Sequence, residues 1–102
     1  MRGITVNTLR NTYGPIDLES QAGVAVSHTV TVQNVDWSDT YSIVLSDWSF
    51  ETVDHDLTVT AVLSGDDTVF TVSGTAPEAG IYRWVWLSSH NIVRVEGWVT
   101  AW

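Results

Sequence analysis

Acidic residues and histidines are the side chains of this sequence that could carry chemistry. Asp54, His55 and Asp56 are consecutive, and Asp66 and Asp67 follow a short distance later. Carboxylates and an imidazole can ligate a metal ion, Ca²⁺ in particular. In an extended chain, however, neighbouring side chains point to opposite faces, so His55 cannot join the face that Asp54 and Asp56 share. An acidic surface loop is the simpler interpretation, and we predict no metal and no cofactor.

The other two histidines show no catalytic pattern. His28 has the same parity as Val26 and Val30, which predicts a hydrogen-bonded histidine at the margin of the core. His90 falls at the tip of a hairpin, where exposure to solvent is expected. No Ser–His–acid motif, phosphate-binding Gly-rich loop or carboxylate pair suited to acid–base catalysis is present. The sequence therefore predicts a protein that is not an enzyme.

Aromatic residues concentrate at the C-terminal end, where residues 80–102 hold four of the six Trp residues. This segment is predicted to form a β-hairpin that is apolar on both faces. A strand in a small sandwich needs only one apolar face, because the other face meets water. We therefore expect something besides the core to cover the second face.

The register of this hairpin is predicted by centring its turn on residues 89–90. Arg83 then lies opposite Glu96 as an ion pair, and further pairs are favourable for a sheet: Trp84 with Val95, Trp86 with Val93 and Tyr82 with Gly97. The side chains predicted to face the core are Tyr82, Trp84, Trp86, Val93 and Val95. The side chains predicted to form an interface are Ile81, Val85, Leu87, Ile92, Trp98 and Trp102. Outward-facing aromatic residues are typical of interface anchors.

The two remaining Trp residues, Trp37 and Trp48, each stand in an Asp-Trp-Ser triplet near a loop. Their indoles could cap the core, or they could line a contact or a surface on which a sugar stacks. Capping of the core is the simpler interpretation for both residues.

The pattern along the chain is β throughout. Apolar residues alternate with Thr and Ser over short runs, and no segment has a sustained helical period. Seven or eight short strands at regular spacing predict an all-β fold, an antiparallel sandwich of two sheets formed by residues 16–102. Its first strand is predicted at residues 16–18. Residues 1–15 are predicted as an N-terminal arm or edge strand, with a candidate strand at residues 4–7.

Residues 70–84 read Phe-Thr-Val-Ser-Gly-Thr-Ala-Pro-Glu-Ala-Gly-Ile-Tyr-Arg-Trp. This segment resembles the signature of the bacterial and archaeal immunoglobulin-like domain family, in which Ser-Gly-Thr-Pro is followed by a short loop, Ala-Gly and a Tyr-containing strand. The spacing from Gly74 to Gly80 matches, but Pro77 stands one position later than the family's proline and Ala76 takes its place. The resemblance implies an immunoglobulin-like sandwich and a binding or structural role without catalytic residues.

The charge of the chain is strongly acidic. The sequence contains twelve acidic residues and four basic ones, all of them Arg, which gives a net charge of -8. It contains no Cys. This balance argues against binding nucleic acid, and the lack of a long apolar run argues against a membrane span. Abundant Asp without Lys resembles the proteins of halophilic archaea and their viruses, where salt screens self-repulsion. Ordinary acidic solubility is the alternative interpretation.

Together these observations predict a structural protein that works by assembly. The sequence begins with Met and shows no leader or anchor, which favours a cytoplasmic gene product over an exported adhesin. We expect a virion component of a haloarchaeal virus (a capsid decoration, turret or tail accessory protein), assembled in the host cytoplasm. Its expected partners are copies of itself and other virion structural proteins. The alternative is a carbohydrate- or cell-surface-binding module that uses exposed Trp residues to bind a glycan.

Overall fold

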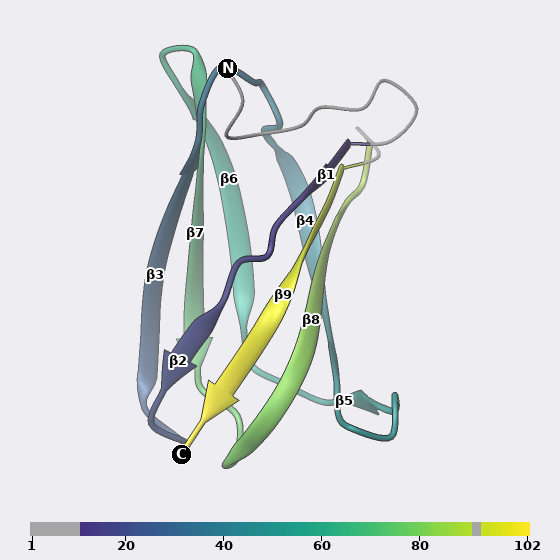
Figure 1. Cartoon of the computed structure of the whole chain (residues 1–102). Helices are drawn as coiled ribbons and strands as arrows, with labels where there is room; N and C mark the ends of the chain where they lie inside the picture. Colours follow the sequence, from purple (N-terminus) through teal and green to yellow (C-terminus); the bar gives the residue numbers. More distant parts are fainter. Residues whose placement is uncertain (1–10, 91–92) are drawn as a thin grey trace.

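The computed structural model describes residues 11–90 and 93–102, and all regular structure in that part of the chain is β (Figure 1). The strands are β1 (Asn11–Tyr13), β2 (Leu18–Ser20), β3 (Ala25–Val32), β4 (Asp39–Ser46), β5 (Thr52–Val53), β6 (Thr58–Ser64), β7 (Asp67–Thr75), β8 (Gly80–Ser88) and β9 (Val93–Ala101). The described residues contain no helix that could span a membrane. The candidate strand at residues 4–7 lies outside the described residues.

The strands form two layers that join at one end (Figure 1). One layer has the order β3-β7-β6, and the other has β9-β8-β4 with β5 on one edge and β1 and β2 on the other. The layers join where Asp39 and Thr40 of β4 pair with β6. In an immunoglobulin sandwich, strands B, E and D face strands C, F and G. Because β3, β7 and β6 face β4, β8 and β9 in the same chain order, the fold is an immunoglobulin-like sandwich, as the sequence predicts.

The N-terminal strands differ from the expected antiparallel arrangement, since β1 and β2 both run parallel to β9. Tyr13 pairs with Val95 and Leu18 pairs with Val99, so residues 14–17 span the length of only three residues of β9. We call residues 14–17 the bulge. The bulge displaces the predicted strand at residues 16–18 toward Leu18–Ser20.

The core lies between the two layers and is built from the inward-facing residues of each strand. The fully buried large side chains are Trp84, Trp86, Phe70, Leu45, Val32, Val72, Val93, Val95 and Val99. The rings of Trp84 and Trp86 meet edge to face with centroids 5.1 Å apart, and Phe70 contacts Trp86 at 5.5 Å. These aromatic contacts occupy the centre of the sandwich, which has no disulfide because the chain has no Cys.

Two tyrosines fix the chain where it enters the second layer. The hydroxyl of Tyr82 donates a hydrogen bond to the carbonyl oxygen of Glu78 at 2.7 Å, which is the tyrosine corner of immunoglobulin-like sandwiches. Tyr41 makes the same bond to the carbonyl oxygen of Trp37, also at 2.7 Å. Burial raises the pKa of both tyrosines, so each hydroxyl remains a donor. In antibody domains a disulfide cysteine follows the corner tyrosine by two residues, and here Trp84 stands at that place.

The β8–β9 hairpin pairs two residues away from the predicted register. Arg83 lies opposite Trp98 and Trp84 lies opposite Gly97, so the predicted positions of Arg83 opposite Glu96 and of Trp84 opposite Val95 are wrong. The predicted ion pair between Arg83 and Glu96 is nevertheless present, with the two side chains 3.0 Å apart. The reason for the different register is the bulge, whose backbone lies directly over Gly97. A Cβ on Gly97 would overlap the carbonyl oxygen of Ile16, and the indole nitrogen of Trp84 donates to that same oxygen at 2.8 Å.

The two-residue shift leaves the faces of the hairpin unchanged, because side chains alternate with a period of two. The five residues predicted to face the core are buried: Tyr82, Trp84, Trp86, Val93 and Val95. Tyr82 lies opposite Val99 and Trp86 opposite Val95, so their predicted partners Gly97 and Val93 are also wrong. Gly97 is required for the close approach of the bulge.

Candidate interaction face

The side of β4, β8 and β9 that points away from the core carries several apolar side chains. We call it the outer face. Trp98 is 47% exposed, Ile81 43%, and Leu87 and Val44 37% each, while Val85 is half-buried. Trp102, just beyond β9, is exposed as well. Five of the six predicted interface residues are therefore accessible at least in part, and Ile92 lies outside the described residues.

Val44 belongs to the outer face, although it is not among the predicted interface residues. It lies directly opposite Val85 in the pairing of β4 with β8. The signal was present in the sequence: Tyr41, Ile43 and Leu45 face the core, and the alternation of a strand then places Val44 on the opposite side.

A cluster of three charges crosses the outer face. Arg83 and Arg94 each donate to a different oxygen of Glu96 at 3.0 Å, and we call these residues the charge cluster. The two arginines hold the pKa of Glu96 below its ordinary value, and the hydrogen bond from Arg83 is the largest cause. The cluster carries a net charge of about +1. Both arginines of the described residues thus lie on one face of a chain whose net charge is -8.

The replacement Glu96→Gln tests the charge cluster. A carboxylate with a lowered pKa stabilises the fold at pH values above its ordinary pKa of 4.5, and that contribution is lost as the pH falls through the lowered value. At neutral pH we expect E96Q to lower the free energy of unfolding by less than about 1 kcal/mol, because the pairs are partly exposed. The measurement is urea unfolding of both proteins between pH 7 and acid. The difference should shrink below pH 4.5, and a difference that stayed constant there would contradict the assignment. The matched control is Glu19→Gln, at an exposed carboxylate with no ion pair among the described residues.

A groove runs along the outer face beside the bulge. It has a volume of about 480 Å³, and its lining includes Thr12, Gly14, Pro15, Arg83, Glu96 and Trp98. The groove forms because the chain leaves β9 at Gly14 and returns at Leu18. Two hydrogen bonds hold the bulge in place, from Ile16 N to the Glu96 carbonyl at 2.9 Å and from Trp98 N to the Asp17 carboxylate at 3.1 Å. An indole, a proline ring and a guanidinium group therefore meet in one open depression.

The structure separates the two loop tryptophans. Trp37 is buried and packs edge to face on Tyr13, so the prediction that it caps the core is confirmed. Trp48 is 74% exposed, and the same prediction is wrong for it. Trp48 lies in the turn between β4 and β5, beyond the end of the core, and Phe50 of this turn is 81% exposed. We call residues 47–51 the aromatic turn.

His55 is used by the fold. Its Nδ1 accepts the backbone N–H of Leu57 at 3.0 Å, so its Nε2 carries the proton and donates to the Ile43 carbonyl at 2.8 Å. Both ring nitrogens are therefore occupied by backbone groups. Among the described residues, no group of three or more His, Asp or Glu side chains could hold a metal ion. His28 is half-buried on the core-facing side of β3.

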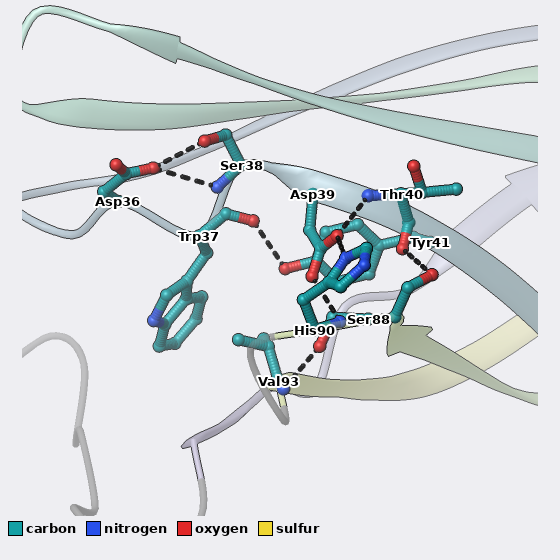
Figure 2. A network of polar contacts seen from close by, with 10 residues as sticks. Asp36, Trp37, Ser38, Asp39, Thr40, Tyr41, Ser88, His90 and Val93 are labelled. Atoms are coloured by element: carbon teal, nitrogen blue, oxygen red, sulfur yellow. Dashed lines mark hydrogen bonds and ion pairs between the residues drawn. The ribbon is translucent and has the colours of Figure 1, made fainter.

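His90 helps to fix the tip of the hairpin onto the start of β4 (Figure 2). The carboxylate of Asp39 accepts hydrogen bonds from the backbone N–H and the Nδ1 of His90, both at 2.8 Å, and from Thr40 N at 2.7 Å. Ser89 donates its N–H and its hydroxyl to the Thr40 carbonyl, each at 3.0 Å. The ring of His90 is exposed as predicted, but the contacts that it makes hold two elements of the fold together.

Comparison with known proteins identifies no family for this chain. No family model matches the sequence, and no curated protein matches it. Among solved structures, the chain is similar to the M1 domain from titin, with 11% identity over 90% of this chain and 89% of that chain and a TM-score of 0.36. A likeness this weak adds no argument. The immunoglobulin-like fold rests on the strand order and the tyrosine corner.

Proposed function

We propose that this protein is a non-catalytic structural module that assembles with copies of itself through the outer face. The observation that carries the proposal is the set of partly exposed apolar side chains that surround the charge cluster: Val44, Ile81, Leu87 and Trp98. Exposed apolar side chains gathered on one face mark contact sites on small proteins. The location of both described arginines on the same face supports it, because two acidic molecules repel each other least where basic groups lie.

The setting that we propose is a virion of a virus that infects a halophilic archaeon, where the module would decorate a capsid or form part of a turret or tail. The support is compositional: a net charge of -8, no Lys and twelve acidic residues suit a medium in which salt screens repulsion. Attachment to other virion proteins would add a second partner. Membership of the bacterial and archaeal immunoglobulin-like family, which residues 70–84 resemble, is part of this proposal.

Light scattering coupled to size-exclusion chromatography in high salt tests the proposal. We expect the wild-type chain to form an oligomer. The double replacement of Leu87 and Trp98 by Ser should leave the fold intact, because both side chains are partly exposed. It should weaken self-association by about a hundredfold, as the loss of two interface anchors of 1–2 kcal/mol each implies.

The matched control replaces Val62 and Leu63 by Ser, since these residues are 57% and 50% exposed on the opposite layer. This variant should associate like the wild type. A wild-type chain that stays monomeric at high concentration would contradict self-assembly, and equal weakening in both variants would contradict the choice of face.

The alternative proposal is a glycan-binding module, and Trp98 is the observation that favours it. Its indole lines the groove beside Arg83, and sugars stack on exposed aromatic rings. Trp48, Trp98 and Trp102 form no ring pair with one another or with another aromatic residue in the described chain, however, so no extended stacking platform supports this reading. Quenching of Trp fluorescence by oligosaccharides, abolished in Trp98→Ala, would favour the alternative.

A further inference from the structure

The aromatic turn displays the most exposed large apolar side chains of the described residues, Trp48 and Phe50. Hydrogen bonds hold the turn in one shape. The carboxylate of Asp47 accepts the backbone N–H groups of Ser49 at 2.8 Å and Glu51 at 3.2 Å, and the backbone of Asp47 bonds with Phe50 and Glu51, each at 3.0 Å. A turn fixed in this way loses little conformational entropy when it binds a partner.

Phe50 has a backbone φ of 60°, in the left-handed region that favours glycine. A residue with a Cβ is disfavoured there by about 1–2 kcal/mol. Glycine would remove this cost, yet the chain presents a phenyl ring to solvent at this position. Strained backbone is common in segments that clamp a ligand or a partner, and a binding role for the ring would account for its presence.

The aromatic turn and the groove lie at the same level on opposite sides of β8. Ser46, the last residue before the turn, pairs with Arg83, and Arg83 pairs with Trp98 at the groove. Adjacent strands are separated by about 4.8 Å. The turn therefore begins on β4, on one side of Arg83, and the groove begins on β9, on its other side. Suppose that two molecules are placed with their outer faces together and are related by a twofold axis that lies between the faces, parallel to β8. This axis brings the β4 side of each molecule over the β9 side of the other. It places the turn of each molecule over the groove of the other.

The two surfaces are complementary in chemistry. The exposed rings of the turn would meet the indole of Trp98 and the ring of Pro15 in a groove of about 480 Å³. The acidic residues that flank these rings, Asp47 and Glu51, would approach Arg83, which is partly exposed and belongs to a cluster with a net positive charge. Contacts that are complementary in charge and apolar at their centre specify one docking arrangement.

We propose that two copies of this chain form a closed dimer in which the aromatic turn of each copy inserts into the groove of the other. This inference rests on the proposed self-association through the outer face and gives that association its symmetry. Each contact is made twice, so the dimer leaves neither a free turn nor a free groove. Higher assembly would then use other surfaces of the molecule.

The absence of Cys from the chain permits a site-directed cross-linking test. Ser49→Cys places a thiol in the turn between Trp48 and Phe50, and Thr12→Cys places one in the groove. With a short bismaleimide, a mixture of S49C and T12C should give cross-linked dimers, whereas neither variant alone should, because the axis separates like sites. The matched control is Thr29→Cys on the exposed side of β3, which should not cross-link to S49C.

The double variant S49C/T12C distinguishes a closed dimer from an open chain. A reciprocal contact gives cross-linked products that end at the dimer, whereas a head-to-tail contact gives a ladder of larger products. A ladder, or cross-linking of S49C to T29C as efficient as to T12C, would overturn the proposal. If light scattering shows a dimer and S49C never links to T12C, the reciprocal contact is wrong while assembly through the outer face stands. A wild-type monomer would contradict both.

The variant Phe50→Gly provides a second test, because it separates a role of Phe50 in binding from a role in stabilising the fold. We expect the variant to unfold at the same temperature as the wild-type monomer or above it, because glycine is favoured at this φ. Its self-association should weaken by about tenfold or more, as expected for an interface anchor. An unchanged dissociation constant would overturn the role of Phe50.

Discussion

Replacement of Gly97 by alanine is expected to lower the free energy of unfolding by about 3 kcal/mol, the upper part of the range for added atoms in a packed core. The new Cβ would overlap the carbonyl oxygen of Ile16, and the obstacle is backbone that cannot rotate away. Either β9 or the bulge must therefore move, and Trp84 would lose its hydrogen bond to Ile16. Urea unfolding measures the loss, and the NMR signal of the Trp84 indole N–H reports the broken bond.

The comparison for this variant is Gly65→Ala. Gly65 has a φ of 63°, and a Cβ there would meet no atom within 4 Å. The substitution should cost only the left-handed backbone penalty of about 1–2 kcal/mol and leave the Trp84 signal unchanged. If G97A is as stable as the wild type, or if its Trp84 signal does not move, the bulge does not pack against Gly97 as described.

Replacement of Trp84 by alanine is expected to cost about 3–5 kcal/mol, the range for removing a buried aromatic side chain. The indole is fully buried, it packs edge to face on Trp86, and it satisfies the carbonyl oxygen of Ile16. Since a small domain has a total stability of about 5–15 kcal/mol, this loss is a large part of the free energy of unfolding. Chemical unfolding monitored by circular dichroism measures the change, and Trp84→Phe gives an intermediate value if the alanine variant does not fold.

Trp48→Ala is the matched control, since it removes the same side chain from an exposed position. At concentrations where the chain is monomeric, we expect its stability to lie within about 0.5 kcal/mol of the wild type, as for most surface substitutions. Comparable losses at the two positions would contradict the assignment of Trp84 to the core and of Trp48 to the surface.

The alternation of side chains explains how much could be predicted from the sequence. A period of two, with Val and Thr dominant and turns at regular spacing, is sufficient to predict an all-β sandwich. The same period assigns each residue of the closing hairpin to a face. Tyr82, Trp84 and Trp86 are therefore correctly placed in the core, and Ile81, Leu87 and Trp98 outside it, although the predicted register was wrong by two residues. A shift of two residues preserves every face, so the parity was predictable even where the pairing was not.

Contacts between distant parts of the chain decided the rest. The register of β8 and β9 depends on the backbone of Ile16, which lies 81 positions before Gly97 in the sequence. The residues next to Gly97 therefore show no pattern that would predict this contact. The direction of β1 and β2 and the groove beside the bulge depend on the same packing. The exposure of Trp48 was set by where β4 ends, beyond the reach of the core. Local periodicity determines which way a side chain points, because it follows from the geometry of one strand. What that side chain meets depends on which strands come together, and only the tertiary structure determines this.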